Sequence, residues 1–87
     1  MNTTEFGDII GNMDLISAIR FKDDRGGSFS IRNSFDDYYI IVFDGMTGFN
    51  VRFDTIGVRN EMSDLVDLFF EDARCATIDV RHLEVVA

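Results

Sequence analysis

The run from Tyr38 to Phe43 constrains the fold more than any other feature of the chain. Its six residues are all aromatic or β-branched, so neither face of an extended strand made from them carries a charge. A run of this kind is typical of a strand in the interior of a sheet, and it is far below the roughly 18 apolar residues that a membrane span requires. We therefore expect a sheet with other elements packed on it.

Segments of alternating apolar and polar residues predict the strands around this run. We expect a hairpin over residues 19–32 with its turn at 23–27, and another strand at residues 49–53 after a turn at 44–48. Alternation resumes near residue 78 and changes phase before residue 85. This change predicts a last strand with a bulge near Arg81 or His82.

Two segments have apolar residues at helical spacing. The first ends at Leu15 and begins at Thr4 or Asp8, and the second covers residues 61–74 behind a good cap residue. The sequence therefore predicts a single α+β domain over residues 1–87, in the element order α-β-β-β-β-α-β. Its sheet is largely antiparallel, with about five strands, and both helices pack on it.

Composition agrees with one hydrophobic core. A chain of 87 residues is long enough for one domain, and 46% of its residues are hydrophobic, nine of them Phe. Cys75 is the only cysteine, so no intramolecular disulfide forms, and residues 1–5 lack the features of a secretion signal. We therefore expect a cytoplasmic protein.

The charge balance is strongly acidic. Sixteen Asp and Glu against eight Lys and Arg give a formal net charge of −8. A field of this sign repels nucleic acid and anionic lipid, and it favours encounter with basic surfaces. We therefore expect a basic protein as the partner, with no direct binding to nucleic acid or to a membrane.

Residues suited to catalysis or metal binding are scarce. A pair of Cys75 and His82 could supply a nucleophile and a base, but we interpret Cys75 as a small buried side chain and His82 as a strand residue. One Cys and one His do not make a zinc site, and the acidic turns at 23–27 and 44–48 lack the spacing of a calcium loop. We therefore expect no enzyme, no metal and no cofactor.

Acidic side chains are predicted to gather at a helix face and at the two ends of the sheet. On the predicted helix 61–74, three carboxylates lie opposite the apolar residues and form a ridge. Alternate turns of an antiparallel meander share an end, so the turns at 23–27 and 44–48 form one acidic rim, and those at 33–37 and Asp54 form the other. A solvated surface without a partner is the alternative interpretation. The candidate partner-binding residues are Asp23, Asp24, Asp36, Asp37, Asp44, Asp64, Asp67, Glu71 and Asp72.

The basic residues of the strands are predicted to share one face of the sheet. They occupy the polar phase of their strands: Arg20, Lys22, Arg32 and Arg52. Since the central strand is apolar in both phases, the row Tyr39-Ile41-Phe43 or the row Tyr38-Ile40-Val42 lies among them, either covered or offered to a partner. We take Tyr39, Ile41 and Phe43 as the candidate interface of this alternative.

Three functions follow from these features. The first is an inhibitor whose carboxylates occupy the basic surface of a nucleic-acid-handling protein, as a DNA mimic does. In size, acidity and lack of catalytic groups the chain is similar to phage inhibitors of restriction or CRISPR nucleases and to bacterial immunity proteins, without a family motif. The second is a structural or regulatory module, a homodimer or small subunit, that pairs through the apolar sheet face. The third is a small-molecule or metal-responsive pocket near Tyr38, Phe43 and His82.

Overall fold

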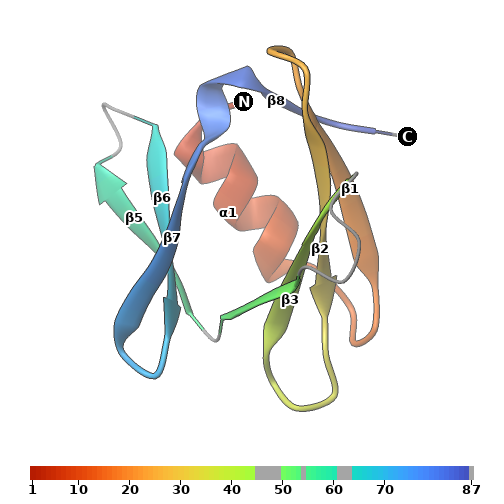
Figure 1. Ribbon diagram of the computed structural model, residues 1–87, viewed down its shortest axis with the longest axis vertical. Coiled ribbons are helices and arrows are strands. Elements are labelled where there is room, and N and C mark those ends of the chain that lie inside the picture. Colours follow the sequence, from red (N-terminus) through yellow and green to blue (C-terminus); the bar gives the residue numbers. More distant parts are fainter. Residues whose placement is uncertain (45–49, 54, 61–63, 87) are drawn as a thin grey trace.

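Two antiparallel sheets and one helix surround the hydrophobic core of the described chain (Figure 1). The computed structural model describes residues 1–44, 50–53, 55–60 and 64–86, and for the second and third of these ranges it describes the backbone alone. The elements in chain order are α1 (Thr3–Gly11), β1 (Ala18–Asp23), β2 (Ser28–Asn33), β3 (Tyr39–Phe43), β4 (Asn50–Phe53), β5 (Thr55–Asn60), β6 (Leu65–Phe70), β7 (Ala73–Asp79), the 3-10 turn η1 (Val80–His82) and β8 (Leu83–Val85).

The strands form sheet A, in the order β4-β3-β2-β1-β8, and sheet B, in the order β5-β6-β7. Every pair of neighbouring strands is antiparallel. The predicted class, a small α+β fold with a mostly antiparallel sheet, is therefore confirmed. The prediction of about five strands in one sheet with two helices is wrong, because the described residues form a five-stranded sheet, a three-stranded sheet and one α-helix.

The chain passes between the sheets at both of their edges. One residue separates β4, at an edge of sheet A, from β5, at an edge of sheet B. At the opposite edges, β7 continues through η1 into β8. A 3-10 turn therefore stands where the sequence predicted a bulge, because the chain leaves one sheet there and joins the other. The side chain of Asp79 caps this turn by accepting a hydrogen bond from the Arg81 amide (3.1 Å).

Helix α1 begins after Asn2, whose side chain accepts a hydrogen bond from the Glu5 amide (2.8 Å). Phe6 and Ile10, one turn apart, are buried against the sheets. The helix ends at Gly11, four residues before the predicted end at Leu15. No helix in the described ranges has the length and apolar character needed to span a membrane.

Four phenylalanine rings pack against one another in series through the core. The ring centroids of Phe6 and Phe21 lie 5.4 Å apart, those of Phe21 and Phe29 5.5 Å, and those of Phe29 and Phe43 5.8 Å. This series of contacts joins α1 to β1, β2 and β3. Aliphatic side chains from α1, both sheets and η1 complete the buried cluster: Ile10, Ile31, Ile41, Val66, Leu68, Val80 and Leu83.

The predicted helix over residues 61–74 is wrong. Within the described part of this segment, β6 ends at Phe70, Glu71 and Asp72 form a two-residue turn, and Ala73 begins β7. Five of the six residues of β6 are apolar, a composition that suits an interior strand as well as a helix face. Since β6 pairs with β5 on one side and β7 on the other, both of its edges are hydrogen-bonded and tertiary pairing overrides helix propensity.

The row Tyr39-Ile41-Phe43 of strand β3 faces the core. We had predicted this row as the alternative interface. Ile41 is fully buried, and Tyr39 and Phe43 pack against the core cluster, so this assignment of an exposed face is wrong. Ile40 and Val42 form the outer row, in register with Arg32 and Ser30. The basic side chains predicted for the outer face are exposed in three cases: Arg20, Lys22 and Arg32. The structure does not describe the side chain of Arg52, the fourth.

Candidate functional site

Two acidic turns lie at the same end of the molecule, the lower end in Figure 1. One turn joins β2 to β3 and the other joins β6 to β7, so they come from different sheets. Their neighbours Tyr38 and Phe70 bring them together, with ring centroids 5.5 Å apart. We call the four exposed carboxylates of these turns the acidic end: Asp36, Asp37, Glu71 and Asp72.

Three of these carboxylates belong to residues with left-handed backbone conformation. The φ angles are 61° at Asp37, 50° at Glu71 and 64° at Asp72. Glu71 and Asp72 form a two-residue hairpin turn with both central φ positive, a conformation in which Asn-Gly is strongly preferred. For a residue other than Gly, Asn or Asp, the left-handed conformation costs roughly 1–2 kcal/mol of conformational free energy. Glu71 is therefore not the residue that backbone stability favours.

Three carboxylates of the acidic end are not neutralised by ion pairs. Among the described residues, Asp36, Asp37 and Asp72 form no ion pair. Exposed carboxylates without an ion pair project their field into solvent, where a basic partner is attracted. Part of the charge expected from the composition therefore remains uncompensated at this end.

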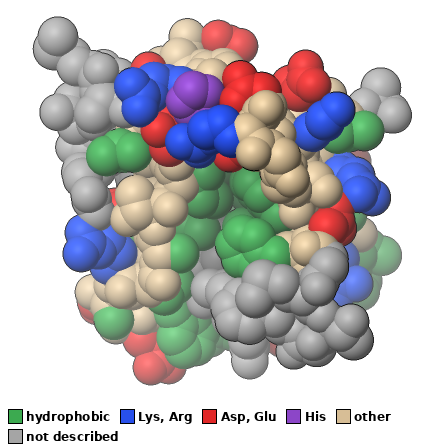
Figure 2. Space-filling view, turned by 45° about the horizontal axis from the view of Figure 1, so that its top comes forward, with side chains coloured by type: hydrophobic (Ala, Val, Ile, Leu, Met, Phe, Trp, Pro, Cys, Tyr) green, Lys and Arg blue, Asp and Glu red, His purple; other side chains and the backbone are tan. Residues whose placement is uncertain are grey.

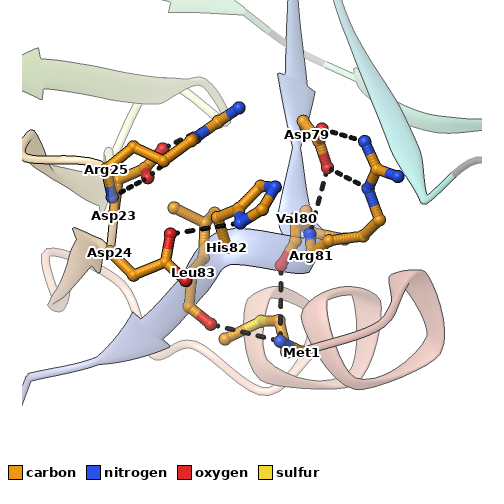
Figure 3. Close-up of polar contacts among 9 residues, drawn as sticks. All are labelled: Met1, Asp23, Asp24, Arg25, Asp79, Val80, Arg81, His82 and Leu83. Carbon is orange, nitrogen blue, oxygen red and sulfur yellow. Dashed lines mark hydrogen bonds and ion pairs between the residues drawn. The ribbon is translucent and has the colours of Figure 1, made fainter.

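The opposite end is acidic in sequence but ion-paired in structure. Figure 2 shows acidic and basic side chains intermixed around the histidine at this end, and Figure 3 shows their contacts. The Asp23 carboxylate accepts hydrogen bonds from the Arg25 amide (2.8 Å), Nε (3.1 Å) and Nη2 (3.0 Å). These bonds lower the pKa of Asp23 below its ordinary value.

Asp79, the last residue of β7, repeats this arrangement at the start of η1. Its carboxylate accepts hydrogen bonds from Nε (3.1 Å) and Nη2 (2.8 Å) of Arg81, and this pairing lowers its pKa to about 2. The two units are held together, because the Asp24 amide donates to the His82 carbonyl (3.0 Å) and the His82 Nδ1 lies 3.1 Å from the Asp24 carboxylate. We call Asp23, Asp24 and Asp79 with these partners the ion-paired end.

The remaining candidate carboxylates are not part of the acidic end. Asp44 forms an ion pair with Arg20 and accepts a hydrogen bond from the Ser28 hydroxyl. The predicted ridge of Asp64, Asp67 and Glu71 is absent, because it required the helix. Asp67 is instead buried in β6 at 7% exposure and accepts a hydrogen bond from the Thr77 hydroxyl (2.7 Å), while Asp64 precedes β6 and is half-buried.

Of the predicted rim of Asp23, Asp24 and Asp44, the structure brings two members together. Asp23 and Asp44 line the same cleft, and Asp24 is not among its lining residues. The other predicted rim included Asp54, which lies outside the described residues. Its remaining members, Asp36 and Asp37, meet the β6–β7 turn, which sequence reasoning had placed in a helix.

Cys75 and His82 occupy positions different from those predicted. Cys75 is exposed on β7, where its thiol donates to the Leu68 carbonyl (3.3 Å), so its predicted burial is wrong. His82 belongs to η1 and not to a strand. Within the described ranges, no three His, Cys, Asp or Glu side chains converge as a metal site would require.

An exposed aromatic residue stands within the acidic end. Phe35 is 70% exposed beside Asp36, and the nearby turn at residues 14–17 also exposes Leu15 and Ile16. The two turns are joined by a hydrogen bond from the Asn33 amide to the Ser17 carbonyl (3.0 Å). Sequence analysis missed this patch, although a Phe inside a predicted turn was a visible signal.

The arrangement combines a protruding apolar side chain with hydrogen-bond acceptors of negative charge. Such a surface can accept hydrogen bonds from Lys and Arg while an aromatic ring enters a shallow pocket. No protein-family model matches the chain, and no curated protein or solved structure shows significant similarity to it.

Proposed function

We propose that this protein is a non-enzymatic inhibitor that binds the basic surface of a nuclease or another nucleic-acid-handling protein through its acidic end, as a DNA mimic. The observation that carries this proposal is the juxtaposition of two acidic turns from different sheets, held by the contact between Tyr38 and Phe70. A rigid array of carboxylates can occupy the cationic groups that otherwise bind phosphates.

The distribution of ion pairs supports this choice of surface. Arginine side chains neutralise Asp23 and Asp79 at the opposite end, whereas Asp36, Asp37 and Asp72 have no such partner among the described residues. Long-range attraction depends on uncompensated charge, so the acidic end dominates the encounter with a basic protein.

The exposed ring of Phe35 supports a protein partner. Residues that contribute most to binding are commonly aromatic and lie inside a polar rim that excludes water. Phe35 is the most exposed of the described large hydrophobic residues, and Asp36 and Asp37 directly follow it in the turn. We infer that its ring enters a pocket on the partner while the carboxylates meet the surrounding bases.

The test is an affinity series against a panel of basic nucleases, measured by fluorescence anisotropy between about 50 and 200 mM salt. At least one nuclease is expected to bind, with Kd rising steeply with salt, and duplex DNA is expected to compete. Inhibition of that nuclease should follow the same salt dependence. Absence of binding across the panel, or binding that is indifferent to salt, would contradict the proposal.

The turn residues Glu71 and Asp72 offer a second test, in which stability and binding change in opposite directions. Replacing them by Asn and Gly should raise the free energy of unfolding by about 1 kcal/mol, because this pair suits the left-handed conformation. The same double variant should bind the partner more weakly, since two carboxylates of the acidic end are lost. Urea denaturation and anisotropy measure the two effects, and a variant with unchanged or tighter binding would argue against the assignment of this turn.

A further inference from the structure

A cleft opens between the two sheets, at a site distinct from the acidic end. It has a volume of about 350 Å³, within the range of small-molecule pockets, and lies between β2 and β3 of sheet A and β7 of sheet B. Figure 2 shows the hollow as a hydrophobic surface below the charged rim of the ion-paired end. Of the pocket predicted from the sequence near Tyr38, Phe43 and His82, only Phe43 lines this cleft. The apolar lining residues are Phe29, Ile41, Phe43, Ala76, Ile78 and Leu83.

The walls of the cleft belong to the folded core. Ile41 is fully buried, Phe29 and Leu83 are nearly so, and all three are members of the core cluster. The ring centroids of Phe29 and Phe43 lie 5.8 Å apart. Ala76, which packs against the core cluster, has the smallest side chain of the apolar lining residues. The cleft therefore exists before a ligand arrives, and filling it requires little ordering of the protein.

The charged rim holds the two sides of the cleft at a fixed spacing. Asp23 lines it from the sheet A side and Asp79 from the β7 side. The residues next in the chain are bonded to one another, because the Asp24 amide donates to the His82 carbonyl (3.0 Å) and the His82 Nδ1 lies 3.1 Å from the Asp24 carboxylate. These contacts join the β1–β2 turn to η1.

The charges on this rim compensate one another. Each charged residue that lines the cleft already has a partner of opposite sign: Asp23 with Arg25, Asp44 with Arg20 and Asp79 with Arg81. A charged ligand would lose hydration between the apolar walls and would have to compete with these ion pairs for a counter-charge. The cleft therefore favours a molecule without charge.

We propose that this cleft binds a small uncharged molecule with an apolar body, an aromatic or aliphatic compound without an ionised group. The apolar body lies against Phe29, Phe43 and Ile78, and removal of apolar surface from water drives binding. The rings of Phe29 and Phe43, tilted by 49° to each other, give it an aromatic contact surface. The site goes beyond the proposed inhibitor function, since it uses none of the residues of the acidic end.

The first test compares three probes of nearly equal shape: 4-phenylbutan-1-ol, 4-phenylbutylamine and 4-phenylbutyrate. Isothermal titration should show saturable binding of the alcohol with a Kd of about 1 mM or below. The amine and the carboxylate should each bind at least about tenfold more weakly, because their charge is desolvated without a free counter-charge. Amide chemical shifts should move at Phe43, Ala76 and Ile78 but not at Asp36 or Asp72. Equal or tighter binding of either ion, or no saturation by about 5 mM alcohol, would overturn the proposal.

A fourth probe separates a free ligand from an apolar side chain of a protein partner. N-acetyl-phenylalanine methylamide carries the same phenyl ring on a peptide backbone. We expect it to bind at least about tenfold more weakly than 4-phenylbutan-1-ol, because its two amide groups lose water between apolar walls. Equal or tighter binding of the phenylalanine derivative would overturn the assignment to a free small molecule.

Variants of β7 locate the site. Ala76→Leu places three more carbon atoms in the cleft, so affinity for 4-phenylbutan-1-ol should fall by about tenfold or more. The matched control Ala73→Leu adds the same atoms to the same strand at an exposed position that does not line the cleft, and its affinity should change by less than about twofold. Circular dichroism and a urea titration establish that each variant is folded. If Ala76→Leu does not fold, the smaller Ala76→Val takes its place, with an expected loss of about threefold. A folded Ala76 variant with unchanged affinity would refute the proposed site.

Discussion

Neutralising the acidic end by the triple substitution Asp36→Asn, Asp37→Asn and Asp72→Asn is expected to weaken binding to a basic partner by about 100-fold at low salt. Each of the three carboxylates is exposed, and none has an ion pair among the described residues. Removing them weakens attraction over a distance and removes local hydrogen bonds, so the association rate should fall most. Stopped-flow association and equilibrium anisotropy against the nuclease found by the salt series measure this effect.

A matched control separates this effect from net charge alone. Glu5→Gln, Asp8→Asn and Glu84→Gln remove three exposed carboxylates from α1 and β8, so the net charge changes by the same amount. This control should lose far less affinity than the acidic-end variant. Equal losses would show that binding responds to overall charge and that the two acidic turns have no particular role.

Replacing Phe21 by alanine is expected to lower the free energy of unfolding by about 3–5 kcal/mol. Phe21 is fully buried at the centre of the core, with its ring 5.4 Å from that of Phe6 and 5.5 Å from that of Phe29. The substitution removes both ring contacts and leaves a cavity between α1 and sheet A that the surrounding strands cannot close. Total stabilities of small domains are of similar size, so much of the variant should be unfolded at room temperature.

The matched control for Phe21 is the same substitution at Phe35. Since Phe35 is 70% exposed, Phe35→Ala should change the free energy of unfolding by no more than about 0.5 kcal/mol. Urea titration followed by circular dichroism compares the two variants. A Phe21→Ala protein as stable as Phe35→Ala would contradict the described core. Phe35→Ala should instead reduce affinity for the partner, which separates the roles of the two rings.

Local periodicity predicted the first half of the fold. The alternation in β1 and β2 and the apolar run of β3 follow from which side chains face the core, and this information is contained in short segments. Helix α1 was predicted for the same reason, although its end was placed too late. The outward direction of Arg20, Lys22 and Arg32 followed directly from the strand alternation.

The second half required information that local patterns do not contain. The spacing of Leu65, Val66 and Phe69 matches a helix face, but the same residues suit a strand between β5 and β7. The backbone hydrogen bonds that decide between them come from residues distant in sequence. The prediction of the candidate site failed for the same reason. The ridge of carboxylates required a helix, and Glu71 lies instead with Asp72 in the hairpin turn between β6 and β7.

The sequence by itself determined the acidic charge, the alternating strands around Tyr39–Phe43 and the shortage of catalytic groups. Only the tertiary structure decided which acid pairs with Arg20, which row of β3 is buried, and which turns meet at the contact of Tyr38 with Phe70. The physical reason is range: alternation, charge and ion pairs between residues two positions apart, such as Asp23 with Arg25, are properties of neighbouring residues, whereas burial and contacts between distant segments exist only in the folded chain.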